Sequence, residues 1–254
     1  MEAKNARREF LRASTVVGAA FVFNACARGK SQLGQSNSQP MAKGDENAKD
    51  GEVTATEDLM REHGVLRRAL LVYNETAPTL RSNASAVAPD ALQKTARLFR
   101  AFGEDYHEKK LEETYIFPAV KKAGGAAAAL PDILIAQHQR GREITDYILA
   151  VTNGAKLSAS NSEPLAQALV ALVRMYEHHA ASEDTVIFPA WKQTLTEEQL
   201  DEMADKFEDI EKQQFGSDGY EDAVKQIGDI EGSLGLSDLS QFTAPPPPTY
   251  SPGR

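Results

Sequence analysis

Residues 106–118 read Tyr-His-Glu-Lys-Lys-Leu-Glu-Glu-Thr-Tyr-Ile-Phe-Pro, and residues 177–189 read Glu-His-His-Ala-Ala-Ser-Glu-Asp-Thr-Val-Ile-Phe-Pro. The two stretches align with a shift of 71 residues and share Glu112 with Glu183, a threonine two residues later and the closing Ile-Phe-Pro. The repeat predicts a pseudo-two-fold site to which each copy gives a carboxylate, an arrangement suited to two metal ions bridged by oxygen ligands. A duplicated packing motif without metal is the alternative.

The sequence around both copies has the apolar period of α-helices and predicts an all-α fold. Capping residues at Thr54 and Thr196 and stop signals at Gly124-Gly125 and Asn153-Gly154 mark the helix ends. The predicted helices start after Thr54 and cover about 90–122, 131–152, 162–192, 197–215 and 219–234. Four long helices joined by short loops predict an antiparallel up-down four-helix bundle, with an additional C-terminal helix.

All five histidines fall on the four long helices, and each of these helices has at least one. His63, His138 and His179 take core-facing positions, and His107 lies on the remaining helix. A single buried histidine is usually a satisfied core residue, because each ring nitrogen can find a partner. Glu183 shares the core stripe of His179, and a core glutamate must be paired, protonated or bound to metal. A metal in the bundle interior would satisfy all of these groups together.

These residues resemble the pattern of the hemerythrin-like (HHE cation-binding) family. That pattern has a histidine on the first helix, His-x-x-x-Glu-Glu before Phe-Pro on the second, a histidine on the third and His-x-x-x-Glu/Asp before Phe-Pro on the fourth. The matching residues are His63, Glu112 with its neighbour His107 or Glu108, His138, His179 and Glu183. The resemblance covers about 54–195. It implies a non-haem di-iron centre in a four-helix bundle that binds dioxygen, peroxide or nitric oxide.

Nitrogen and carboxylate ligands without sulfur favour iron over manganese and zinc. Members of the family that carry oxygen are similar in having a second histidine one turn after the ligand of helix three. In this sequence Arg142 occupies that place. The sequence therefore favours redox chemistry or iron handling over simple carriage, and a metal- and oxygen-binding protein over a dedicated enzyme. His178 is turned about 100° from His179 on a helix and is expected to face solvent or support the site.

Alternative functions come from other classes. The zinc-protease motif His-Glu-x-x-His fails because Leu111 occupies the position of the second histidine. A ferritin-like storage or oxidase site would need Glu-x-x-His on two helices, and only Glu104 with His107 supplies it. A metal-free helical interaction module at the envelope is the third possibility.

Helix two contains a conflict of register. His107 lies five residues before Glu112, a separation of about 140° on a regular helix, whereas a four-residue spacing separates side chains by about 40°. A π-bulge between residues 106 and 112 would bring His107 and Glu112 to the core face and turn Lys109 and Lys110 outward. We therefore predict that His107, rather than Glu108, is the ligand.

The chain ends predict export to the bacterial cell envelope. Residues 1–27 contain Arg7-Arg8, a short apolar run and small residues around Cys26, and resemble a twin-arginine signal peptide read by that export machinery. Either Cys26 is lipidated, which we favour, or cleavage follows Ala27, so the product is lipid-anchored or periplasmic. Residues 28–53 form a predicted disordered linker, 54–215 the hemerythrin-like bundle, and 216–254 a short helix and a proline-rich tail.

Composition excludes several kinds of partner and of metal site. The net charge of −9 argues against nucleic acid as a partner, and the expected membrane contact is limited to a lipid on Cys26. The single cysteine excludes an internal disulfide, a four-cysteine zinc site and an iron–sulfur cluster. The expected ligand is a small diatomic molecule or peroxide.

Overall fold

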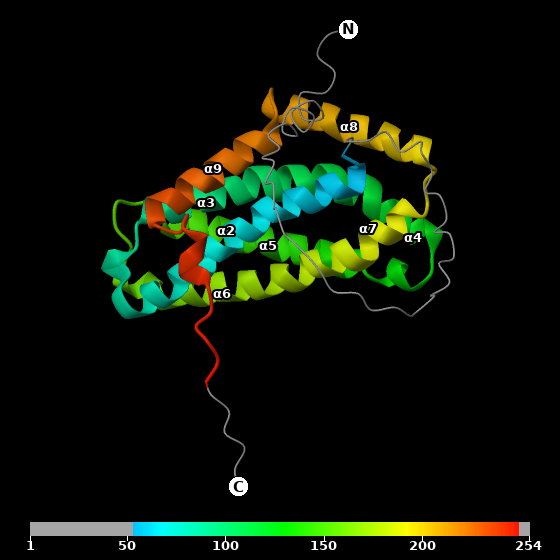
Figure 1. Cartoon of the computed structure of the whole chain (residues 1–254). Helices are drawn as coiled ribbons and strands as arrows, with labels where there is room; N and C mark the ends of the chain where they lie inside the picture. Colours follow the sequence, from blue (N-terminus) through cyan, green and yellow to red (C-terminus); the bar gives the residue numbers. More distant parts are fainter. Residues whose placement is uncertain (1–52, 249–254) are drawn as a thin grey trace, which may run out of the picture. The chain divides into compact units, whose positions relative to one another are not determined.

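The computed structural model describes residues 53–248, and the regular structure in that range is entirely helical (Figure 1). The all-α prediction is therefore confirmed for these residues. The predicted signal peptide at 1–27, residues 28–52 of the linker predicted at 28–53 and the last six residues of the proline-rich tail lie outside the described residues. The predicted division of the chain into domains stays a prediction.

The helices follow one another along the chain with short connections. Their bounds are α2 Ala55–Asn83, η1 Ala84–Ala86, α3 Pro89–Leu98, η2 Phe99–Ile116, α4 Phe117–Ala123, η3 Ala126–Ala129, α5 Pro131–Val151, α6 Ala159–Ser182, η4 Glu183–Ile187, α7 Phe188–Lys192, α8 Glu197–Phe215, α9 Gly219–Leu234 and η5 Leu239–Phe242. The segments η2 and η4 are π-helical, and η1, η3 and η5 are 3₁₀ turns. Each predicted helix is present within a few residues of its expected limits.

Local sequence explains the helix ends. The Thr54 side chain accepts a hydrogen bond from the backbone N–H of Glu57, which satisfies one free donor at the start of α2. At α8, Thr196 and Gln199 form the complete reciprocal capping box. Gly124 ends α4 with a φ of 78°, a backbone conformation that disfavours residues with a side chain.

The long helices pack side by side. In Figure 1, α2 runs along α6, and α5 packs mainly against α6, α3 and η2. The last two long helices pack on this set of helices. Helix α9 contacts α2 and α3, and helix α8 contacts α2 and η2. Arg68 on α2 makes a bidentate ion pair with Glu231 on α9, with N–O distances of 2.9 and 2.5 Å. None of the helices within residues 53–248 has the length and apolar character that a membrane span requires.

The predicted π-bulge between residues 106 and 112 is confirmed, and the π-helical stretch is longer than expected, covering all of η2. The backbone N–H of Phe117 bonds to the carbonyl of Glu112, five residues earlier, and the N–H of Phe188 bonds to the carbonyl of Glu183 in the same way. In both places a proline follows. Proline lacks an N–H and its ring excludes the carbonyl four residues before it, so the preceding turn widens.

Candidate metal centre

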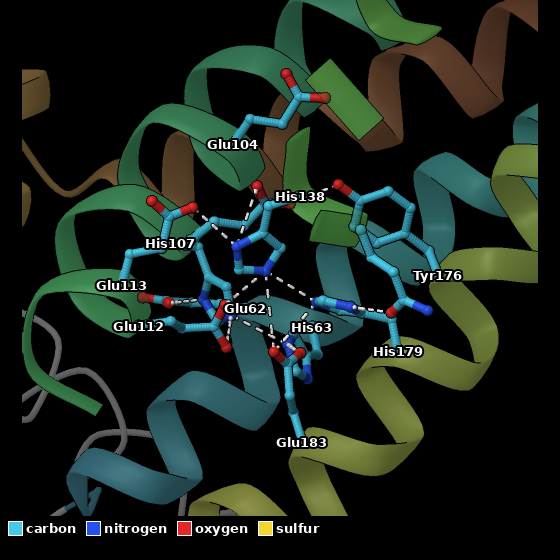
Figure 2. Close-up of polar contacts among 12 residues, drawn as sticks. Glu62, His63, Glu104, His107, Glu112, Glu113, His138, Tyr176, His179 and Glu183 are labelled. Carbon is cyan, nitrogen blue, oxygen red and sulfur yellow. Dashed lines mark hydrogen bonds and ion pairs between the residues drawn. The ribbon is translucent and has the colours of Figure 1, made fainter. Parts of the chain in front are cut away.

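Four buried histidines, one from each of α2, η2, α5 and α6, meet inside the helical core (Figure 2). None has more than 3% of its surface exposed. The Nε2 atoms of His63 and His107 lie 3.0 Å apart, and those of His138 and His179 also lie 3.0 Å apart. We call His63 with His107 the first pair, and His138 with His179 the second pair.

The opposite ring nitrogen of each histidine faces an oxygen acceptor. The Nδ1 atoms of the first pair lie 2.7 Å from Asp184 and 2.6 Å from Glu62, and those of the second pair lie 2.9 Å from Glu113 and from Gln137. A carboxylate or amide oxygen accepts hydrogen bonds, so we assign the ring proton of each histidine to Nδ1. Each Nε2 then presents a lone pair, and the lone pairs within a pair repel one another unless a cation joins them.

The spacing within each pair is suited to a shared metal ion. Two imidazole nitrogens bound to one ion at about 2.1 Å lie about 3.0 to 3.4 Å apart, for angles between a right angle and the tetrahedral angle. The 3.0 Å separations of the two pairs agree with this range. Hydrogen bonds from the remaining ring nitrogen to carboxylate or carbonyl oxygens are typical of histidines that bind metal.

The repeated acids Glu112 and Glu183 connect the two pairs. Both side chains are fully buried, and none of their four carboxylate oxygens has a hydrogen-bond partner. Glu112 places one oxygen 3.3 Å from Nε2 of His107 and the other 3.4 Å from Nε2 of His138. Glu183 places its oxygens 3.5 Å from Nε2 of His63 and 3.1 Å from Nε2 of His179. Each carboxylate therefore reaches both pairs.

Two sets of potential ligand atoms result. One consists of Glu112, His138, His179 and Glu183, and the other of His63, His107 and Glu112, with the ligand atoms of each set within 4.8 Å of one another. A buried carboxylate without a hydrogen bond or a counter-charge is costly. A bound cation would satisfy the orphaned oxygens of Glu112 and Glu183 and the facing lone pairs together, so the residues present fit a metal.

The charges at the site are strongly interdependent. Burial alone would raise the pKa of Glu112, but His107 and His138 hold it well below its usual range. Burial and the charge of Glu112 raise the pKa of Glu183 well above normal. Burial would lower the pKa of His138, but Glu108, Glu112 and Glu113 raise it to about 10, whereas burial and His138 lower the pKa of His179 to about 4. Protons thus take the place of a cation, and metal binding must release them.

Glu108 lies beside the centre with different partners. Its carboxylate accepts hydrogen bonds from the hydroxyl of Tyr176 at 2.6 Å and from Arg142 at 3.1 Å, and lies 3.9 Å from Nδ1 of His138. Glu108, Glu113 and His138 form a third set of potential ligands, but the guanidinium of Arg142 bonds to both acids. Arg142 already supplies the cation that this third set requires.

His107 shows how the π-helix serves the centre. Its Nε2 atom lies 3.3 Å from Glu112, five residues away, and the matching distance between His179 and Glu183, four residues apart, is 3.1 Å. The wider turns of the π-helix η2 therefore bring a histidine and a glutamate together across five residues, as the helix end at His179 does across four. Lys109 and Lys110 are exposed, as the predicted bulge requires. His178 is also exposed, which agrees with its expected position away from the core.

A small cavity borders the first pair and His179 of the second pair. It is lined by polar ligand candidates, by the side chain of Arg67, and by Leu66, Leu70, Ala180 and Tyr176, and it has room for about one water-sized molecule. The Tyr176 hydroxyl is held by Glu108, and burial with the charge of Glu108 raises its pKa well above normal. The cavity thus has an apolar wall, one neutral hydroxyl and the cationic side chain of Arg67 beside the candidate ligands.

The residues that support the histidines were not predicted from the sequence. They are Glu62, Glu113, Gln137 and Asp184, together with Arg67 and Arg142, which bond to Asp184 and Glu113. The signal was present as a second repeat, Glu-His-x-x-x-Arg at 62–67 and Gln-His-x-x-x-Arg at 137–142. Glu113 and Asp184 also occupy matching places in the first repeat.

Comparisons with known proteins agree with this geometry. The family described as Hemerythrin HHE cation binding domain matches residues 54–191. The chain is 40% identical over 238 residues to the uncharacterized protein Rv1995 of Mycobacterium tuberculosis, a match that covers 93% of this chain and 90% of that relative. The uncharacterized protein Mb2018 of Mycobacterium bovis is similar to the same extent. No solved structure matches the chain. With its buried histidine and glutamate groups arranged to hold a cation, the chain belongs to the hemerythrin HHE cation-binding family.

Proposed function

We propose that the protein binds two iron ions, which the two histidine pairs together with Glu112 and Glu183 would hold. The observation that carries this proposal is the set of four buried carboxylate oxygens without hydrogen bonds, divided between the two pairs. The absence of sulfur ligands supports iron over manganese and zinc. We also infer that the four long helical stretches form an antiparallel up-down bundle around this centre.

Metal analysis tests the two-iron proposal. Protein purified from iron-replete cells is expected to contain close to two irons per chain, and His179→Ala and Glu183→Ala are expected to lose metal. The matched control is His178→Ala, which removes an exposed imidazole next to His179 and should leave the metal content unchanged. One tightly held zinc ion without iron would overturn the proposal. Equal metal loss from the control would point to unfolding instead.

We further propose that the centre reacts with dioxygen, peroxide or nitric oxide, as an oxidant-handling or iron-handling protein. Two iron ions, when bound, would supply electrons to such ligands. The chain supplies a cavity for one small molecule, an apolar wall at Leu66 and Leu70, and the hydroxyl of Tyr176. Glu108 holds that hydroxyl in place, so Tyr176 can orient water or ligand at the cavity.

Absorbance after reduced protein is mixed with air distinguishes the activities. A reversible charge-transfer band would indicate carriage, and irreversible bleaching would indicate oxidase or peroxidase chemistry. The absence of any response to air, peroxide or nitric oxide would remove this part of the proposal while leaving metal storage. The ferritin-like alternative has less support, because Glu104 bonds to Thr145 and Arg100 rather than lying among the candidate ligands.

We propose that the protein acts in the bacterial cell envelope, exported by twin-arginine machinery and either lipid-anchored through Cys26 or released into the periplasm. The proposal rests on the sequence of residues 1–27. Replacing Arg7 and Arg8 together by lysine should leave the precursor in the cytoplasm. Normal export of that double variant would show that the signal has been misread. The mass of the mature N-terminus then separates lipidation of Cys26 from cleavage after Ala27.

A further inference from the structure

The two histidine pairs have unequal support. In the first pair both imidazoles bond to carboxylates, His63 to Asp184 and His107 to Glu62. In the second pair His138 bonds to the carboxylate of Glu113, but His179 bonds to the neutral amide of Gln137. Glu62 and Gln137 occupy matching places, each immediately before a histidine, so the difference in support between the two pairs comes from this position.

The environment of Glu62 leaves its charge directed at His107. Its side chain has 1% of its surface exposed, and its described partners are His107 at 2.6 Å and the hydroxyl of Tyr106 at 3.1 Å. The other two supporting carboxylates share their charge with arginines, Asp184 with Arg67 and Glu113 with Arg142. Of the acids that bond to the imidazoles, Glu62 is thus the one without an arginine or lysine partner among the described residues.

Glu108 does not remove this inequality. It brings a carboxylate near the second pair, but its oxygens accept hydrogen bonds from Tyr176 and Arg142, and its distance of 3.9 Å from His138 is too long for a hydrogen bond. A carboxylate that accepts a hydrogen bond from the N–H of an imidazole raises the basicity of the other ring nitrogen. An amide oxygen in the same position raises that basicity only weakly. His107 should therefore be the strongest nitrogen donor of the four.

We propose that the first pair binds its metal ion more tightly and fills before the second pair, and that Glu62 sets this order. The inference rests on the proposed two-metal centre. Glu62 acts through His107 and is a positioning residue rather than a ligand. Supporting groups of this kind change metal affinity by about 10- to 100-fold, so the two binding steps should be separated by a factor of this size.

Titration of the metal-free protein with cobalt(II), followed by calorimetry and by the visible spectrum of the bound ion, tests the order. The unmodified protein is expected to bind two ions in two resolved steps. Glu62→Gln should weaken the first step about 10- to 100-fold and leave the second unchanged. The reciprocal variant, Gln137→Glu, should strengthen the second step by a similar factor, and both changes preserve the size of the side chain.

His179→Ala locates the steps, because it should abolish the weak step and retain the tight one. Circular dichroism of each metal-free variant establishes that it is folded. Two ions bound with equal affinity, or two steps that neither Glu62→Gln nor Gln137→Glu alters, would overturn the inference while leaving the two-metal proposal intact. Binding of one ion or none by the unmodified protein would instead defeat the proposed function.

Discussion

The half of the centre built on α2 and η2 and the half built on α5 and α6 reach the same geometry by different means. The first half places its histidine five residues before its glutamate on a π-helix, and the second half uses four residues leading out of an α-helix. The resulting distances are 3.3 and 3.1 Å. Sequence spacing alone is therefore a poor guide to which side chains meet, because the helix can change its pitch to preserve a contact.

The halves differ again behind the ligands, since a buried carboxylate supports His107 and an amide supports His179. The largest predicted effect follows from this difference. In metal-free protein, His107→Ala would leave the buried charge of Glu62 without its main partner and should cost about 3–5 kcal/mol of unfolding free energy. His179→Ala leaves a half-buried amide and should cost about 1–3 kcal/mol.

Urea unfolding of both metal-free variants at pH 7 measures these losses. His178→Ala is again the control, because its exposed side chain should contribute little. Equal losses from His107→Ala and His179→Ala would mean that the supporting charge at Glu62 has no consequence for stability.

The second prediction concerns Glu104, a buried acid of η2 whose matching place in α6 is Met175. Burial raises the pKa of Glu104 from 4.5 to about 7, although Thr145 donates a hydrogen bond to it. Between pH 4.5 and pH 7, Glu104 is therefore protonated in the folded state and ionised in the unfolded state. The free energy of unfolding falls as pH rises through this range, and it stays at the lower value above pH 7.

Glu104→Gln removes this titration. Relative to the unmodified protein, the variant should gain up to about 3 kcal/mol between pH 4.5 and pH 8, on top of a constant difference from the altered bonds to Thr145 and Arg100. Urea unfolding at both pH values gives the change. A stability difference that stays constant over this range would contradict the raised pKa of Glu104.

The third prediction tests a close approach in the second half. A methyl group added at Gly141 on α5 would lie 2.2 Å from the hydroxyl of Tyr176, which is buried and bonded to Glu108. Gly141→Ala must displace that ring and should cost about 1–3 kcal/mol. Thermal unfolding measures the loss, and stability equal to that of the unmodified protein would show that Tyr176 can move freely.

The smallest effect is expected in the first half and has the opposite sign. Gly64 lies within α2 beside His63, and a methyl group there would meet nothing within 4 Å. Gly64→Ala should stabilise the protein by about 0.5–1 kcal/mol, because alanine favours the helix interior more than glycine. The same thermal unfolding experiment applies. Destabilisation by Gly64→Ala would show that α2 is more tightly constrained beside the centre than its surroundings indicate.

Much of the fold could be predicted from periodicity and end signals. The caps at Thr54 and Thr196 and the stop at Gly124 depend on local chemistry, which a sequence displays directly. The register conflict around His107 likewise predicted a π-bulge between 106 and 112. Its extension back to Phe99 could not be predicted, because the length of a π-helical stretch depends on how the surrounding side chains pack.

The candidate ligands could also be predicted from the sequence, because histidine and glutamate at core positions are costly without partners. Their supporting groups were harder to identify, since Glu62 and Asp184 become partners of His107 and His63 through tertiary packing. Arg142 stands where the oxygen-carrying members of the family have a second histidine. In the structure it bonds to Glu113, the acid behind His138, and the only sign of this role in the sequence is the repeated spacing of Arg67 after His63 and Arg142 after His138.

The two Phe-Pro steps have a consequence for how the centre assembles. Phe117 stacks on His138 at 5.6 Å, and Phe188 stacks on His63 at 5.3 Å, so each repeat braces a histidine of the other half. Asp184, which holds His63, lies 121 residues further along the chain. The first pair, His63 and His107, therefore receives its support from Asp184 and Phe188 only after the fourth long helix has formed and docked, which is a late, non-local event. A chain that ends before that helix would have His63 and His107 but neither the carboxylate behind His63 nor the ring stacked on it.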